Sequence, residues 1–283
     1  MQSTQGMQTA MFRPNIRKTQ GRSALTLLDV IFHASVRTIR KSHRNAAFGL
    51  IMNMFQAVLF VLIFMVTFQL LGLKHTAVRG DFMLYIMSGV FMFMTHTKTM
   101  GAVAGSEGPT SAMMKHAPMN TIVSISAAAL STLYTQVLSA CVMLLFYHVV
   151  FQPITIDQPI GTLGMLILSW ISGAAIGMIF LAAKPWNPDL VGVLTMIYMR
   201  MNMIASGKMF LANTMPTHIL AYFTWNPLFH TIDQTRGFVF LNYNPHYSSI
   251  IYPVKVTVVC ILIGLMGDFY TRRHASVSWG AKG

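Results

Sequence analysis

The feature that most constrains the fold of this chain is an uncharged, largely apolar run over residues 46–73. As a helix this run would be about 42 Å long at roughly 1.5 Å per residue, which exceeds the hydrocarbon core of a bilayer, about 30 Å. Similar stretches cover residues 121–152, 160–183 and 246–266, the last interrupted by Lys255 alone. The sequence therefore predicts an all-α, polytopic membrane protein.

The composition agrees with a membrane-embedded chain, since 54% of the residues are hydrophobic and only 10% are charged. A net charge of +13 can indicate nucleic-acid binding, but Lys and Arg lie between the apolar runs rather than among exposed aromatic residues. We therefore expect no nucleic-acid partner.

Cys141 and Cys260 each lie in an apolar stretch, which excludes a disulfide framework and a cysteine-rich metal site. The histidines lack metal-ligand spacing, so we expect no metal.

The charges also predict the orientation of the chain, because Lys and Arg accumulate in the cytoplasmic loops of membrane proteins. Of the 20 Lys and Arg, fourteen fall on the side of both termini and four on the other, with the remaining two inside the fifth span. Both termini are thus expected in the cytoplasm. The predicted transmembrane domain covers residues 46–272, and its six spans are residues 46–73, 82–104, 121–151, 160–183, 190–212 and 248–266.

The segment before the first span predicts an amphipathic helix over residues 23–45. Its apolar residues recur at three- and four-residue spacing, and basic residues collect toward its end. Such a helix can lie in the cytoplasmic interface, either as a basic anchor or as a docking element for a partner. The flanking residues 1–22 and 273–283 are predicted cytoplasmic tails.

Between spans five and six, residues 213–247 are too apolar for a free domain and too interrupted to span a membrane. Pro216 and Pro227 break a run rich in aromatic residues. Such backbone is tolerated at membrane depth only where it is buried in protein or lines a cavity. We predict a re-entrant helical pair on the outer side, residues 217–225 and 227–240; the alternative is an interfacial aromatic loop.

Two cations, Arg200 and Lys208, lie inside the fifth predicted span. A charge at the bilayer centre costs about 2.5 to 3.5 kcal/mol unless it faces protein or water. Because residues eight apart are about two helical turns apart, both side chains can project from one face. We predict that Arg200 lines a pathway, whereas Lys208 either does so or extends to the outer interface.

The loop after span two predicts a short cytoplasmic helix that starts near Thr110 and ends before Pro118, although a solvated turn is the alternative. Such a helix can transmit force from a soluble ATPase. This chain has no phosphate-binding loop of its own, since its only Gly-Lys pair, Gly207-Lys208, is followed by Met209. Any ATP hydrolysis must therefore occur on another polypeptide, and no cofactor is expected in this chain.

Small residues recur at the spacing that lets helices approach closely, at Gly101 and Gly105 and at Gly173 and Gly177. Because this spacing is common in membrane spans, we expect it to serve helix packing rather than a specific dimer interface.

Taken in order, these features resemble the permease subunits of type-2 ABC exporters, and most closely those of capsular polysaccharide and O-antigen exporters. The resemblance extends over nearly the whole chain, but its specific part is the segment between spans five and six. Asp233 stands where Glu is common in the family, and the basic N-terminus is longer than usual. The matching motifs are Ser206-Gly207, Met215-Pro216, Trp225-Asn226-Pro227-Leu228 and Asp233-x-x-Arg236. Asp233 and Arg236 lie one helical turn apart and can pair with each other.

The resemblance implies a homodimeric permease of the bacterial inner membrane that works with two separate ATPase subunits, which bind ATP and magnesium. Its implied substrate is a lipid-linked, anionic glycan taken from the cytoplasmic leaflet. Residues 107–119 would form the coupling helix, in which Glu107, Lys115 and Pro118 would contact the ATPase. The other implied site residues are Arg200, Lys208, Tyr198, Phe210 and Trp225 in the translocation path, and Gly207, Pro216, Asn226, Pro227, Asp233 and Arg236 in the re-entrant signature.

Two other classes remain open at the level of sequence. An integral membrane glycosyl- or acyltransferase acting on a lipid-linked substrate would need a cluster of acids, bases or metal ligands at one membrane face, whereas the seven carboxylates here are dispersed along the chain. A passive channel or an assembly scaffold would not need a loop that faces an ATPase.

Overall fold

A computed structural model describes residues 20–42, 46–70, 81–109, 111 and 120–274, and within these ranges the chain is helical with no β-strand. The all-α prediction is therefore confirmed. Most of the predicted coupling helix, including Lys115 and Pro118, lies outside the described residues, as do most of the predicted tails.

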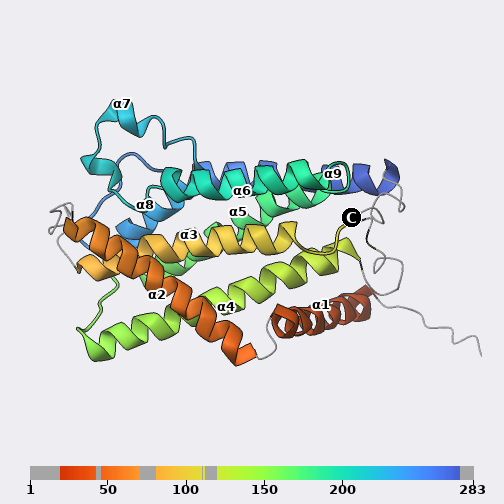
Figure 1. Cartoon of the computed structure of the whole chain (residues 1–283), viewed down its shortest axis with the longest axis horizontal. Coiled ribbons are helices and arrows are strands. Elements are labelled where there is room, and N and C mark those ends of the chain that lie inside the picture. Colours follow the sequence, from red (N-terminus) through yellow and green to blue (C-terminus); the bar gives the residue numbers. More distant parts are fainter. Residues whose placement is uncertain (1–19, 43–45, 71–80, 110, 112–119, 275–283) are drawn as a thin grey trace, which may run out of the picture.

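Six long helices, each at the position of a predicted span, form a bundle along the long axis of the molecule, and α2 runs obliquely to this axis (Figure 1). The helix α1 (Gln20–Ser42) and the end of α9 lie at one end of this bundle, whereas α8 (Pro227–Val239) lies at the other. The six long helices are α2 (Ala46–Leu70), α3 (Phe82–Ala104), α4 (Thr121–Val150), α5 (Pro159–Ala183), α6 (Pro188–Ala205) and α9 (Ile251–His274).

Three of the six helices, α4, α5 and α9, are long and apolar enough in the described residues to cross a membrane. In α2 the apolar part is the shorter stretch Ile51–Thr67. The 18 residues of α6 would extend about 27 Å, slightly less than the roughly 30 Å of a hydrocarbon core. The helices thus occur where the spans were expected, and the count of six crossings stays a prediction.

Helices α3, α4, α5 and α6 begin where the sequence provides side-chain caps or prolines. Asp81 accepts a hydrogen bond from Met83 N at the start of α3, and Asn120 accepts one from Ile122 N at the start of α4. Both side chains satisfy backbone donors that have no partner within the helix. At α5 and α6 a proline occupies the first turn, where its missing N–H costs nothing.

The centre of the bundle is α3, which is buried along most of its length and packs closely against α5. A Cβ atom added to Gly173 would lie 2.3 Å from the carbonyl oxygen of His96, and one added to Gly177 would lie 2.7 Å from that of Met100. Only glycine permits this approach of two backbones. The expectation that this glycine pair serves helix packing is confirmed.

The predicted amphipathic helix is present as α1, which packs against α4 and α2. Ile31 and Ser35 are buried, whereas Leu28 and Phe32 are each 62% exposed. Exposed apolar side chains of this size suit a helix that lies in a membrane interface.

The fifth predicted span is shorter than expected, because α6 ends at Ala205 rather than at residue 212. Gly207 adopts a positive φ of 71° just beyond this end. Glycine adopts this left-handed conformation readily and commonly terminates helices in this way. Lys208 therefore follows the helix instead of belonging to it, and the prediction that it shares a helical face with Arg200 is wrong.

Beyond this turn the chain forms the short 3-10 helix η2 (Ala212–Thr214), the four-residue helix α7 (Thr217–Leu220), and then α8. Helix α8 closely matches the predicted residues 227–240, whereas the first member of the predicted pair, residues 217–225, is helical over α7 only. Their insertion into a membrane as a re-entrant pair stays a prediction.

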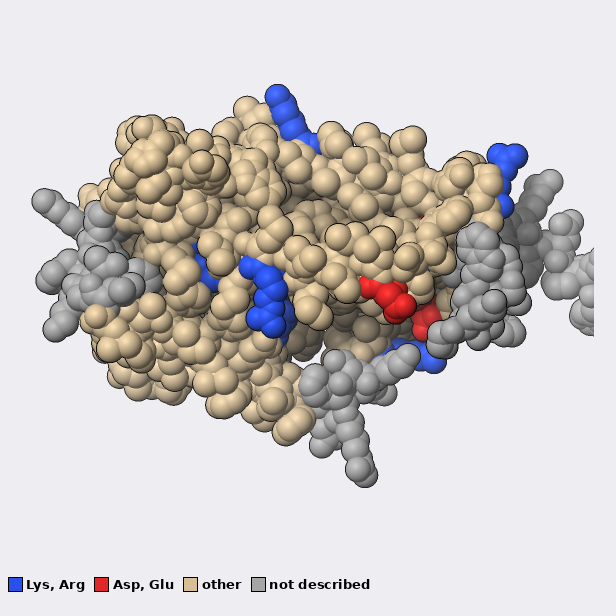
Figure 2. All heavy atoms as spheres, turned by 45° about the horizontal axis from the view of Figure 1, so that its top comes forward, with Lys and Arg blue, Asp and Glu red and all other residues tan. Residues whose placement is uncertain are grey.

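Figure 2 shows that the visible face of the molecule is largely free of charged side chains, which are confined to a few places. Large apolar residues on α2, α4, α6 and α9 are exposed. An apolar surface of this extent is typical of contact with lipid or with another membrane subunit.

The close packing of α3 and α5 predicts that Gly173→Ala destabilises the protein by about 1 to 3 kcal/mol, because the added methyl group must displace backbone. Gly164→Ala on the same helix is the matched control, since a Cβ atom there would meet no atom within 4 Å. Thermal unfolding of both variants in detergent measures the difference, and equal melting midpoints would contradict the assigned packing.

Candidate functional site

The segment between α6 and α8 is organised by the guanidinium group of Arg236, which is only 1% exposed. Its Nη1 atom donates hydrogen bonds to the carbonyl oxygens of Gly207 (3.1 Å) and Phe210 (2.5 Å), and its Nη2 atom donates to that of Lys208 (2.6 Å). The carbon between them lies 4.2 Å from the centre of the Tyr85 ring on α3. We call these contacts the Arg236 clasp; they join α8 to the turn after α6 and to α3.

Glycines make room for this clasp on both of its sides. A Cβ atom on Gly207 would lie 2.5 Å from the Phe229 ring, so the turn can pack directly on α8. On α3, a Cβ atom at Gly89 would approach Arg236 Nη2 to 3.1 Å and the Lys208 carbonyl oxygen to 3.2 Å. The sequence indicated a role for Gly207 but gave no signal for Gly89, whose importance depends on a contact distant in the chain.

Asp233 and Arg236 form no ion pair, and the prediction that they pair along one helical turn is wrong. The Asp233 carboxylate instead accepts hydrogen bonds from the Tyr243 hydroxyl (2.5 Å) and the Ser248 hydroxyl (2.6 Å). Because Arg236 donates to the carbonyl oxygens of the turn, Asp233 is free to hold the loop that follows α8. Burial, together with this neighbouring carboxylate, raises the pKa of Tyr243, which keeps its hydroxyl protonated as a donor.

Asn226 connects the start of α8 to the end of α6. Its Oδ1 atom accepts from Leu228 N, which caps α8, and Pro227 occupies the first turn. Its Nδ2 atom donates to Asn202 Oδ1 at 2.9 Å and to the Ala205 carbonyl oxygen at 3.0 Å. The Asn226-Pro227 motif is therefore a helix start that also fixes the position of α8 against α6.

His230 is a further polar residue of α8, for which the sequence pattern gave no signal. Its Nδ1 atom accepts from Ser249 N (3.1 Å), and its Nε2 atom faces the Thr224 carbonyl oxygen at 2.7 Å. Burial lowers the pKa of His230, which agrees with a neutral ring that donates from Nε2 and accepts at Nδ1. The ring thereby joins the segments before and after α8.

Lys208 is buried, with 3% exposure, and does not reach the surface. Its ammonium nitrogen lies 3.3 Å from the centre of the Phe93 ring and 5.3 Å from that of Phe64, and it has no hydrogen-bond partner among the described residues. Aromatic faces attract such a cation electrostatically. The structure thus places Lys208 against α2 and α3 rather than at the outer interface.

The residues predicted to line a translocation path have different surroundings in the structure. Arg200 is exposed on α6, and Trp225 is 51% exposed beyond α7. Tyr198 places its hydroxyl 2.9 Å from His96 Nε2 in the interior. Phe210 packs edge-to-face on Phe223, with ring centres 4.7 Å apart.

The other predicted motif residues lie at loop ends. Pro216 precedes α7, and its carbonyl oxygen accepts from Ile219 N and Leu220 N. Glu107 follows α3; its backbone N–H donates to Ser124 Oγ (3.1 Å) and its carboxylate accepts from Ser111 Oγ (2.5 Å). Glu107 therefore fixes the start of the loop in which a coupling helix was predicted.

The chain was also compared with known proteins, and no protein-family model matches it. Two curated proteins of Escherichia coli, each named polysialic acid transport protein KpsM, are 24% and 25% identical to it over 206 residues. These alignments cover 70% of this chain and 76% of each relative. The chain is similar to capsular polysaccharide ABC permeases. The family resemblance drawn from its sequence is thereby confirmed.

This similarity supports a multi-pass membrane protein that serves in polysaccharide transport, and it implies an ATP-binding partner. It favours a transport subunit over the alternative of a membrane transferase. In the described part of the chain, no three His, Cys, Asp or Glu side chains come together as metal ligands.

The Arg236 clasp predicts that Arg236→Met lowers the free energy of unfolding by about 3 kcal/mol, because it leaves three buried or partly buried carbonyl oxygens without their charged donor. Arg272→Met is the matched control: Arg272 pairs with Asp268 at 2.7 Å on a partly exposed face of α9, and pairs at a surface contribute about 0 to 1 kcal/mol. Thermal unfolding in detergent compares the two variants. An equal loss of unfolding free energy in both variants would mean that the clasp stabilises the protein no more than a surface ion pair does.

Proposed function

We propose that this chain is the membrane-spanning permease of an ABC exporter that moves a lipid-linked, anionic polysaccharide across the bacterial inner membrane, driven by ATP hydrolysis on a separate subunit. The observation that carries the proposal is its similarity to the polysialic acid transport proteins over 206 residues. Polysialic acid is itself anionic, which suits a permease with a net charge of +13. The cytoplasmic placement of both termini is part of the proposal.

The assembly that we propose contains two copies of this chain and two ATPase subunits. Apolar side chains exposed on several long helices provide surface that a second copy could cover. The sequence has no phosphate-binding loop, so ATP and magnesium would bind to the partner. The loop that begins at Glu107 would contact that partner, with Lys115 and Pro118 further along it.

The translocation path that we propose includes Arg200 of α6. Its side chain is exposed and forms no ion pair with another described residue. An unpaired cation in a membrane helix is best tolerated where water, substrate or a second subunit meets it. Trp225, which is half exposed, offers an aromatic face on which a sugar ring can stack. In this proposal Lys208, Tyr198 and Phe210 support the wall of the path from behind.

Deletion of the gene, followed by complementation, tests the proposal in cells. We expect loss of polysaccharide from the cell surface with accumulation of lipid-linked glycan inside, and copurification of the tagged permease with an ATP-hydrolysing subunit. Undiminished surface polysaccharide together with loss of a glycosyl- or acyltransferase activity would instead favour the membrane-enzyme alternative.

The assignment of Arg200 to the path predicts that Arg200→Ala impairs export while leaving protein abundance and dimer formation unchanged. Arg200→Lys should retain part of the activity, because it keeps the charge but loses the planar fork. Lys255→Ala on α9 is the control, since Lys255 is another exposed cation in a long helix. Export is measured beside abundance, and wild-type export by Arg200→Ala would exclude Arg200 from the path.

The coupling assignment predicts that Glu107→Arg weakens copurification of the ATPase subunit and lowers substrate-stimulated ATP hydrolysis. Ser111→Ala serves as the comparison, because it removes only the hydroxyl that donates to Glu107. If Ser111→Ala reproduces the full defect, Glu107 acts by ordering the loop rather than by contacting the ATPase. Normal association and hydrolysis in Glu107→Arg would remove Glu107 from the coupling interface.

A further inference from the structure

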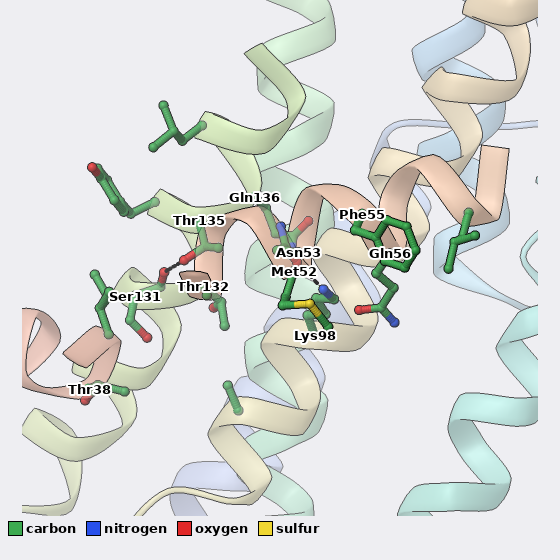
Figure 3. A pocket seen from close by; sticks show the side chains of 16 residues that line it. Thr38, Met52, Asn53, Phe55, Gln56, Lys98, Ser131, Thr132, Thr135 and Gln136 are labelled. Atoms are coloured by element: carbon green, nitrogen blue, oxygen red, sulfur yellow. Dashed lines mark hydrogen bonds between the residues drawn. The ribbon is translucent and has the colours of Figure 1, made fainter. Parts of the chain in front are cut away.

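A cavity of about 780 Å³ lies between α1, α2, α3 and α4, away from the segment between α6 and α8. Figure 3 shows that its labelled polar side chains come from all four of these helices. Lys98, which is half-buried near the end of α3, is the only cation among the described lining residues. Neither Asp nor Glu is among them, so the charge of the cavity is positive.

The polar groups around Lys98 are held in fixed positions. Asn53, which is buried, donates from Nδ2 to Ser139 Oγ at 2.7 Å. Its Oδ1 atom accepts from Gln136 Nε2 at 3.1 Å and also from the Lys98 ammonium group. Asn53 Oδ1 is the only acceptor that Lys98 contacts in the described part of the chain, so two of its three N–H donors remain available. This network presents a positioned cation rather than neutralising it.

The rest of the lining explains what kind of anion the cavity can hold. The hydroxyls of Ser131, Thr132 and Thr135 lie along α4, whereas Met52 and Phe55 of α2 are apolar. A cavity of this volume is much larger than one phosphate group and falls in the range of ligand sites, about 300 to 1,000 Å³. It therefore suits a ligand with an anionic group and an attached apolar part.

We propose that this cavity binds the phosphate group of a lipid, with the phosphate on Lys98 and the adjoining chain against the apolar side chains of α2. Basic pockets between transmembrane helices on the cytoplasmic side commonly bind anionic lipid head groups. Lys98 lies in the last third of α3, and this end of α3 lies at the end of the bundle at which α1 is located (Figure 1), which is cytoplasmic in the proposed topology. The phosphate belongs either to a membrane phospholipid or to a lipid carrier, and the proposal does not depend on the export function.

Lipid binding to the full chain in detergent, followed by native mass spectrometry, tests the proposal. Phosphatidylglycerol and a polyprenyl phosphate are the two phosphate-bearing probes; diacylglycerol lacks the phosphate and inorganic phosphate lacks the lipid. We expect the first two to bind and the last two to bind at least about tenfold more weakly, since hydrogen bonds to charged groups are among the stronger ones. The phosphate lipid that binds more tightly identifies the source of the phosphate group.

Lys98→Met should weaken binding of the phosphate lipids about tenfold, whereas Lys98→Arg should keep most of it. Lys255→Met, which removes an exposed cation outside the cavity, should bind as the wild type does. Thr135→Trp, which fills the cavity and leaves Lys98 in place, should weaken binding as well and covers the case in which Lys98→Met does not fold.

Any one of three results would overturn the proposal. The first is unchanged lipid affinity in both Lys98→Met and Thr135→Trp, and the second is a loss of lipid affinity in Lys255→Met as large as that in Lys98→Met. The third is binding of diacylglycerol as tight as that of the phosphate lipids. Inorganic phosphate that binds as tightly as the lipids would overturn the lipid part. If both cavity variants dissociate a dimer while lipid affinity is unchanged, a second copy of the chain covers the cavity and the lipid assignment is wrong.

Discussion

The interaction on which the segment between α6 and α8 depends is the contact between Arg236 and the carbonyl oxygens of the turn after α6. A buried guanidinium group is costly without partners, and here backbone oxygens rather than a carboxylate provide them. Because the donor and the acceptors belong to segments separated by η2 and α7, the clasp closes a loop of the chain. It thereby fixes α8 against α6 without a salt bridge.

The clasp and the core of the bundle meet on the same helix. Tyr85 and Gly89 of α3 contact the clasp, and two turns further His96 contacts both Ser172 of α5 and Tyr198 of α6. Since α3 and α5 are also in backbone contact at Gly173, a displacement of α3 would disturb both places. The segment between α6 and α8 is thus connected mechanically to the bundle, so a displacement of one can be transmitted to the other.

Sequence patterns predicted most of the helices because apolar runs, caps and prolines act locally. Pro227 and Asn226 mark the start of α8 by rules that involve only adjacent residues. The sequence predicted the contacts between side chains less well. Spacing along one helix suggested an Asp233–Arg236 pair, whereas the hydrogen-bond partners of both side chains lie in other segments. The network of Lys98, Asn53 and Gln136 was missed for the same reason, since its members come from three helices.

Lys98 and Lys208, two lysines in the apolar part of the chain, differ in what replaces water around them. Lys208 is enclosed by aromatic rings, and its backbone carbonyl oxygen is occupied by Arg236, so both ends of the residue serve the fold. Lys98 shares a single amide oxygen with Gln136 and borders a cavity of about 780 Å³. Enclosure of a cation by protein dipoles and rings stabilises one arrangement, whereas a cation beside open volume leaves its remaining donors for a ligand. The same residue type therefore supports the fold at one site and offers a binding group at the other.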